Sequence, residues 1–327
     1  MRNNMKLAIA AAAAAAAAAY FIVKRRQKKT IVITGGCGNL AGKLATHLLS
    51  TCPSEFNVVL IEKEEFYKPD RVAAGASIVL GDCADGLGRW RDALRGADAV
   101  VHFSAVNPYP NADFNESAGS MSHAFNVFLA ASQFGVRRVV FASSNHVMGQ
   151  YKEKRTHGKV RPTDPPACGT PLRNKADLAA SGDAIAYSVA KLAGEQLTRA
   201  MAACSASSGS SKTTFYTLRI GWCQPGENSP KTLSAAGVPP EFQNEGVEAA
   251  SKAGEAEDVD GDWFKGMWLS NGDFLRYFEA AIRGPPPPSG SVVLVNAMSN
   301  NKGMRWSLEE TVAALGVEAR DDSRRKY

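Results

Sequence analysis

The 327-residue sequence predicts an α/β fold built on a doubly wound parallel sheet, with a small C-terminal lobe. Short, β-branched apolar runs alternate with longer stretches of helical periodicity, and the first run leads straight into a glycine-rich loop. Runs that are brief and not alternating are typical of strands buried on both faces of a parallel sheet. A hydrophobic content of 45% is enough for a full core. We expect a main domain over residues 30–220 and a lobe over residues 221–327.

The expected strands and helices follow one another along the chain. The apolar runs predict strands at Ile31–Thr34, Asn57–Ile61, Ser77–Leu80, Ala99–Phe103, Arg138–Ala142, Thr214–Arg219 and Val292–Val295. Apolar residues recur at three- and four-residue steps in the predicted helices, Leu40–Leu49, Phe114–Ser132, Ala184–Cys204, Asp273–Ile282 and Leu308–Leu315.

Two segments interrupt this alternation. Residues 151–182 are polar and contain four prolines, and residues 231–261 are rich in alanine, glycine and acidic residues. Such compositions do not continue strands or helices, so we expect two insertions, of which the first could form a lid and the second could be disordered.

Residues 1–29 are predicted to form a separate N-terminal segment. Leu7–Val23 is apolar and mostly alanine, and the basic run Lys24–Lys29 follows at once. One interpretation is a short transmembrane anchor, which the basic flank would orient with the folded body in the cytosol. The alternative is a cleaved targeting segment that leaves the body in the cytoplasm or an organelle. A surface helix is a third interpretation, and the sequence leaves all three open.

Charge and cysteine usage exclude several classes of protein. The formal net charge is +6, but residues 1–29 carry seven basic residues and no acid, so the rest of the chain is close to neutral. A basic surface for nucleic acid is therefore not expected. The six cysteines form no C-x-x-C pair, and the histidines show no metal-ligand spacing, so we expect neither a metal site nor a disulfide framework.

The glycine loop after the first strand predicts a dinucleotide site. Gly35, Gly38 and Ala41 would let the backbone approach a pyrophosphate, and the following helix would offer its free N–H groups to that anion. An acidic residue at the end of the next strand, Glu62, completes the pattern of a Rossmann fold. The expected cofactor-binding residues are Gly35, Gly38, Asn39, Leu40, Ala41, Glu62, Asp82 and Lys191.

Glu62 also bears on the choice of cofactor. A carboxylate there would accept both ribose hydroxyls and repel the additional phosphate of NADP, which favours NAD. The neighbouring Lys63 could offset that repulsion, so NADP remains the alternative. Asp82, after the third predicted strand, is expected near the adenine end.

A second constellation predicts oxidoreductase chemistry. Tyr187 and Lys191 are four residues apart on one predicted helix face, so the ammonium could lower the pKa of the phenol. A phenol with a pKa near 10 is otherwise a poor base at neutral pH. This pair follows the glycine loop, a central strand and a serine-rich strand end that includes Ser144, in that order.

These motifs in this order resemble the extended short-chain dehydrogenases/reductases of the NAD-dependent epimerase/dehydratase superfamily, and most closely their uronate dehydrogenase branch. The resemblance implies that Tyr187 is the base, that Ser144 positions the reacting oxygen and that Lys191 holds the cofactor ribose. The resemblance rests on the glycine loop, on Tyr187 and Lys191, and on four further stretches: Phe141–Gly149, Leu218–Cys223, Trp268–Phe274 and Leu315–Asp321.

The resemblance also implies substrate contacts. Asn145 and His146 fall where that branch contacts its sugar acid, and Asn107 falls in a substrate-facing loop after the fourth strand. The alternative for His146 is a satisfied core histidine. The chain departs from the pattern at Lys231, which stands where an arginine is expected to hold the carboxylate, and at Trp222, which replaces a serine.

The resulting expectation is an NAD-dependent dehydrogenase that acts on a hydroxyl of a sugar or a sugar acid such as a uronate. A nucleotide-sugar epimerase or reductase of the same superfamily is one alternative, and a catalytically idle NAD(P)-binding redox sensor is another. The expected partner is a small-molecule substrate, with no nucleic acid. The oligomeric state is left open, with a homo-oligomer as one alternative.

Overall fold

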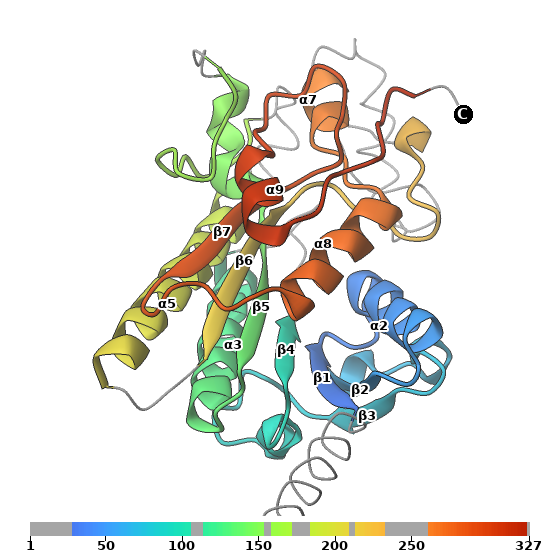
Figure 1. The fold of residues 1–327 in the computed structure, drawn as a ribbon, viewed down its shortest axis with the longest axis vertical. Coiled ribbons are helices and arrows are strands. Elements are labelled where there is room, and N and C mark those ends of the chain that lie inside the picture. Colours follow the sequence, from blue (N-terminus) through green and yellow to red (C-terminus); the bar gives the residue numbers. More distant parts are fainter. Residues whose placement is uncertain are drawn as a thin grey trace, which may run out of the picture.

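Seven parallel strands form one continuous sheet in the computed structural model, which describes residues 28–105, 114–153, 158–171, 184–208, 213–232 and 261–325. The spatial order is β3-β2-β1-β4-β5-β6-β7, and every neighbouring pair is parallel (Figure 1). The chain therefore winds outward in both directions from β1 and β4, which confirms the predicted doubly wound, Rossmann-like sheet. The strands are β1 (Lys29–Thr34), β2 (Phe56–Glu62), β3 (Ser77–Leu80), β4 (Ala99–His102), β5 (Arg138–Ser144), β6 (Thr214–Ile220) and β7 (Val292–Ala297).

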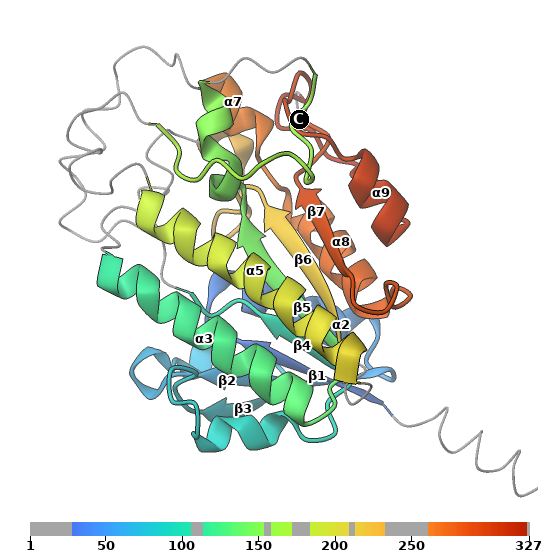
Figure 2. The same cartoon turned by 90° about the vertical axis from the view of Figure 1, so that its left-hand side faces the viewer.

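Helices cover both faces of the sheet. Figure 2 shows α3 and α5 side by side on one face, with α2, α8 and α9 on the other. The α-helices are α2 (Asn39–Thr51), α3 (Phe114–Gln133), α5 (Ile185–Ser208), α7 (Gly261–Gly266), α8 (Asn271–Arg283) and α9 (Glu309–Leu315). Short 3₁₀ helices lie between them: η1 (Glu64–Phe66), η2 (Pro69–Arg71), η3 (Arg89–Leu94), η4 (Asn145–Lys152) and η6 (Pro230–Thr232).

Each face of the sheet has its own hydrophobic core. Phe128 of α3 packs with Phe141 of β5 on one face, and Leu44 of α2 joins Tyr277 and Phe278 of α8 on the other. All five side chains are at most 2% exposed. Because both faces of the central strands are buried, those strands read as continuous apolar runs in the sequence.

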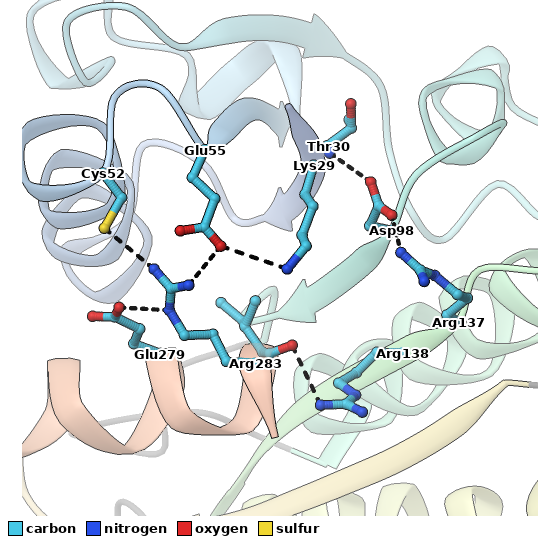
Figure 3. Close-up of polar contacts among 10 residues, drawn as sticks. Lys29, Thr30, Cys52, Glu55, Asp98, Arg137, Arg138, Glu279 and Arg283 are labelled. Carbon is cyan, nitrogen blue, oxygen red and sulfur yellow. Dashed lines mark hydrogen bonds and ion pairs between the residues drawn. The ribbon is translucent and has the colours of Figure 1, made fainter. Parts of the chain in front are cut away.

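Polar contacts hold the amino-terminal edge of the sheet together (Figure 3). Arg283, the last residue of α8, contacts Glu55 at 2.5 Å and Glu279 at 2.7 Å. Arg138 at the start of β5 donates from Nη1 to the carbonyl oxygen of Ala281 at 2.8 Å. The carboxylate of Asp98 accepts from the backbone N–H of Thr30 at 2.9 Å. The contacts of Arg283 with Glu55 and of Arg138 with Ala281 anchor α8 at the end of the sheet opposite to the carboxyl ends of the strands.

The predicted insertion at residues 151–182 packs partly on the body of the protein. Within its described residues 158–171, Val160 is fully buried and forms a parallel bridge with Trp306. Its backbone N–H donates to the carbonyl oxygen of Arg305 at 2.6 Å. This part is therefore a packed connection. The lid interpretation concerns residues 151–182 as a whole, and residues 154–157 and 172–182 of that segment lie outside the described residues.

Other sequence predictions also fall outside the described part of the chain. Leu7–Val23 does so, and so does most of the predicted insertion at residues 231–261. Among the residues that the structure describes, no helix is long and apolar enough to cross a bilayer. Membrane attachment through residues 1–29 remains a prediction, as do the boundary between residues 220 and 221 and the homo-oligomer.

Candidate active site

A cavity of about 880 Å³ opens at the carboxyl ends of the strands. Its wall is formed by the glycine loop after β1, the carboxyl ends of β2 to β6 and the start of α5. In a doubly wound sheet this is the place where ligands bind, because the connections from β1 and β4 leave toward opposite faces and open a crevice. Its size suits an organic cofactor together with a small substrate.

The glycine loop has the geometry of an anion cradle. Gly35 has a φ of +72°, and a Cβ atom there would lie 3.2 Å from the backbone nitrogen of Ser104. A larger residue would thus be strained and crowded at this position. Gly38 is the N-cap of α2 and supplies no side-chain bond, so the first N–H groups of that helix remain available to a ligand. Asn39, Leu40 and Ala41 line the cavity, as predicted.

Glu62 lies directly against this loop. Its side chain is 9% exposed, with Oε2 accepting from the backbone N–H of Cys37 at 2.9 Å and Oε1 from that of Lys63 at 2.8 Å. These bonds fix the carboxylate and leave further lone pairs for hydroxyl donors in the cavity. Asp82 also lines the cavity, 3.5 Å from Lys63 Nζ and 3.4 Å from His123 Nε2.

The structure brings Ser144, Tyr187 and Lys191 together. Ser144 ends β5 and is buried, and its hydroxyl is close enough to that of Tyr187 on α5 to lower the pKa of the phenol. One turn later, Lys191 Nζ lies 5.7 Å from the centroid of the Tyr187 ring and donates to the carbonyl oxygen of Ala142 at 2.8 Å. Ser144 and Tyr187 line the cavity, whereas Lys191 lies behind them, only 5% exposed.

The pKa of Tyr187 differs from the sequence prediction. Burial raises the pKa of Tyr187 to about 12, and the hydrogen bond from Ser144 only partly opposes this. Burial also lowers the pKa of Lys191 to about 7. The prediction that Lys191 lowers the pKa of the phenol is therefore wrong for this structure, because desolvation of the phenolate outweighs the attraction of a partly neutral amine.

Neutral polar groups surround the cavity beside Tyr187. Asn145 Nδ2 donates to the carbonyl oxygen of Ile220 at 3.1 Å, while its buried Oδ1 has no partner among the described residues. His146 Nδ1 lies 2.7 Å from the Thr170 hydroxyl, and burial lowers the pKa of His146 to about 4, which keeps the ring neutral at physiological pH. Both Asn145 and His146 line the cavity, which favours the binding interpretation of His146 over the core interpretation.

Two predicted substrate contacts are not among the described residues of the cavity wall. Asn107 lies outside the described residues. Lys231 is exposed on η6, and the described wall of the cavity does not include it. Its assignment to a substrate carboxylate stays a prediction.

The structure adds several wall residues that sequence reasoning missed. Thr170 comes from the first insertion, Phe264 from α7, and Lys68 and Arg71 from the connection after β2. No sequence pattern marks them, because each reaches the cavity through long-range folding. Trp222, another wall residue, did have a signal in the sequence, because it stands where the family resemblance places a serine. Its ring lies 5.4 Å from that of Phe264.

Known proteins resemble this chain over most of its length. L-arabinose 1-dehydrogenase (NAD(P)(+)) from Haloferax volcanii is 29% identical over 295 residues, which are 90% of this chain and 97% of the relative. Uronate dehydrogenase from Pseudomonas syringae is 41% identical over 73 residues, 21% of this chain and 26% of the relative. A solved structure of a mutated uronate dehydrogenase has the same fold, with a TM-score of 0.62 at 22% identity over 91% of this chain and 83% of that one.

The sequence profile of the NAD dependent epimerase/dehydratase family matches residues 31–211. That span is more than half of the chain. It holds the glycine loop, Glu62, Ser144, Tyr187 and Lys191. The protein therefore belongs to the NAD dependent epimerase/dehydratase family, the extended short-chain dehydrogenases/reductases.

Proposed function

We propose that this protein is an NAD-dependent dehydrogenase that oxidises a hydroxyl group of a sugar. The observation that carries the proposal is that the side chains of Ser144 and Tyr187 line the same cavity as the glycine loop. The names of the relatives, L-arabinose 1-dehydrogenase and uronate dehydrogenase, support the same kind of reaction.

The walls of the cavity fit the cofactor. The loop from Gly35 to Ala41 would hold the pyrophosphate with backbone N–H groups, and the fixed carboxylate of Glu62 would accept the adenosine ribose hydroxyls. When bound, NAD supplies the acceptor for the hydride from the substrate carbon. Lys68 and Arg71 also line the cavity and would tolerate the phosphate of NADP as the less favoured alternative.

Tyr187 would take the proton from the substrate hydroxyl. The Ser144 hydroxyl accepts from the backbone N–H of His146 at 3.2 Å, which leaves its own proton to hold the substrate oxygen or the tyrosine oxygen. Lys191, held by Ala142, would contribute positive charge behind the phenol when protonated.

A neutral aldose suits the cavity beside Tyr187 best. The unpartnered Asn145 Oδ1 and the neutral His146 would pair with sugar hydroxyls, and the rings of Trp222 and Phe264 offer an apolar wall for the face of a sugar ring. A uronate is the second candidate, favoured by the 73-residue match to uronate dehydrogenase. Oxidation at the anomeric carbon of either ring would produce a lactone.

Net reduction of NAD distinguishes the dehydrogenase from its alternatives. We would incubate the purified protein with NAD and either L-arabinose, galacturonate or a nucleotide sugar, and follow the absorbance of NADH. NADH formed with a sugar or sugar acid supports the proposal. Conversion of a nucleotide sugar without net NADH would indicate an epimerase, and binding of NAD without any turnover would indicate a redox sensor.

Replacing Glu62 with alanine should weaken the binding of NAD more than that of NADP. The ribose hydroxyls lose an acceptor, whereas the phosphate of NADP loses a repulsive neighbour, so the ratio of the two Kd values should move by about tenfold. Titration calorimetry with each cofactor measures this ratio. A shift toward NAD would instead mean that the main role of Glu62 is to hold the loop through Cys37.

The turnover should depend on pH in two stages. With a phenol pKa of about 12, the phenolate fraction of Tyr187 grows about tenfold per pH unit, so turnover should rise steeply from pH 5 to pH 7. Above the Lys191 pKa of about 7, the protonated fraction of Lys191 falls about tenfold per pH unit. This fall offsets the rise in the phenolate fraction of Tyr187, so the turnover should level off. Initial rates between pH 5 and pH 9 test this. A decline from pH 5 to pH 7 would exclude Tyr187 as the base.

A further inference from the structure

A fully buried ion pair joins α5 to β6 behind the catalytic set. Arg219 Nη2 lies 2.7 Å from Glu195 Oε2, and Arg219 Nε lies 2.8 Å from Glu195 Oε1, so the pair is bidentate. Both side chains are 1% exposed, and neither lines the cavity. Such a pair contributes little net stability, because desolvation of two charges offsets their attraction. A role other than stability is therefore worth testing.

The pair is bonded to the end of β5. The Ser143 hydroxyl donates to Glu195 Oε1 at 2.6 Å, and Ser143 is the residue before the catalytic Ser144. Ser143 also faces Arg219 in the register of β5 and β6. The carboxylate of Glu195 thus fixes the backbone from which the Ser144 hydroxyl projects.

The same carboxylate is placed one helical turn after Lys191. Residues four apart share a helix face, and Lys191 Nζ donates to the carbonyl oxygen of Ala142 at 2.8 Å. Consecutive residues of β5, Ala142 and Ser143, are therefore held by consecutive turns of α5. This double contact sets the distance between Ser144 on the strand and Tyr187 on the helix.

Arg219 extends the network toward the substrate side of the cavity. Its Nη1 donates to the carbonyl oxygen of Pro162 at 3.2 Å. Pro162 belongs to the packed segment 158–171, which also carries Thr170, the partner of His146 Nδ1. The ion pair therefore contacts three segments of the site. These are β5, which carries Ser144, α5, which carries Tyr187 and Lys191, and segment 158–171, which carries Thr170.

We propose that Glu195 and Arg219 are positioning residues, which hold Ser144, Tyr187 and Lys191 in the relative placement that hydride transfer requires. This inference rests on the proposed dehydrogenase function. The ion pair touches neither substrate nor cofactor. It acts by preventing β5, α5 and segment 158–171 from shifting against one another, and small shifts of reacting groups cost turnover far more than binding.

The test uses the full chain with the ion pair replaced by apolar residues of similar size, Glu195→Leu together with Arg219→Met. Removing both charges avoids an uncompensated buried ion, so the variant should fold. We expect kcat to fall by about tenfold to a hundredfold, with the KM for NAD changed by less than about twofold. The milder Ser143→Ala variant, which keeps the pair and removes its bond to β5, should lower kcat in the same direction.

Asp273→Asn is the matched control. Asp273 is fully buried, pairs with Arg276 and accepts from the backbone N–H groups of Arg320 and Asp321, away from the cavity. It should lower the melting temperature and keep kcat within about twofold of the wild type. A kcat within about twofold of the wild type in the Glu195→Leu, Arg219→Met variant would overturn the positioning role.

If the proposed function is wrong, the wild-type protein will show no turnover on any sugar. In that case the amide hydrogen exchange of the variants tests whether the ion pair holds these segments in place. Faster exchange over residues 143–150 and 158–171 in the double variant, with unchanged exchange there in Asp273→Asn, supports positioning. Unchanged exchange in the double variant overturns it.

Discussion

Replacing Tyr187 with phenylalanine should reduce turnover by about 10²- to 10⁴-fold while NAD binding stays close to that of the wild type. The variant loses only the hydroxyl beside Ser144, and it keeps the ring that packs edge-on against His146 with centroids 5.9 Å apart. The ring contacts and the glycine loop are unaffected, so the fold and the cofactor site should survive. Initial rates with the best sugar of the panel, together with a calorimetric Kd for NAD, measure both quantities.

Tyr151→Phe is the matched control for that variant. The hydroxyl of Tyr151 donates to the carbonyl oxygen of Pro165 at 3.1 Å, and it is not part of the described cavity wall. The same chemical change there should leave kcat within about twofold of the wild type. Substantial turnover by a folded Tyr187→Phe protein would remove the phenol from the mechanism and leave water or another group as the base.

Replacing Gly149 with alanine should destabilise the fold by about 3 kcal/mol or more. Gly149 lies in η4, just after the catalytic strand end, and a Cβ atom there would lie 2.1 Å from both Gly169 O and Thr170 Oγ1. Because one of these atoms belongs to the backbone, the contact cannot be relieved by rotating a side chain. The segment that supports His146 would have to move, so the melting temperature and the turnover should fall together.

Gly119→Ala provides the comparison on a helix with free space. Gly119 lies within α3, and a Cβ atom there would meet nothing within 4 Å. Alanine at this position should stabilise the protein by about 0.5–1 kcal/mol through helix propensity. Thermal denaturation of both variants measures the difference. If Gly149→Ala melted at the wild-type temperature, the close approach of η4 to segment 158–171 would be wrong.

Local patterns in the sequence were sufficient for the fold. The buried strands appear as uninterrupted apolar runs because both faces of the sheet are covered, and each of the seven predicted strands is present. The helix α7 was missed, since six residues are too few to display a helical period.

Short spacings along the chain also predict several residues of the candidate site. Glycines at Gly35 and Gly38 follow from backbone geometry, and Tyr187 and Lys191 lie one turn apart on any helix. Glu62 is the last residue of β2, and its place at the carboxyl end of this strand could be predicted from the apolar run before it. These features need no knowledge of long-range contacts.

Only the tertiary structure decided what depends on distant segments and on burial. It placed Thr170 against His146 and left Lys231 exposed, because loops do not follow a period that a sequence reveals. It reversed the expected pKa shift of Tyr187, since desolvation depends on how many atoms surround a group and spacing along a helix does not report that number. It also paired Glu195 with Arg219 across 24 residues of sequence, joining helix and sheet behind the catalytic set.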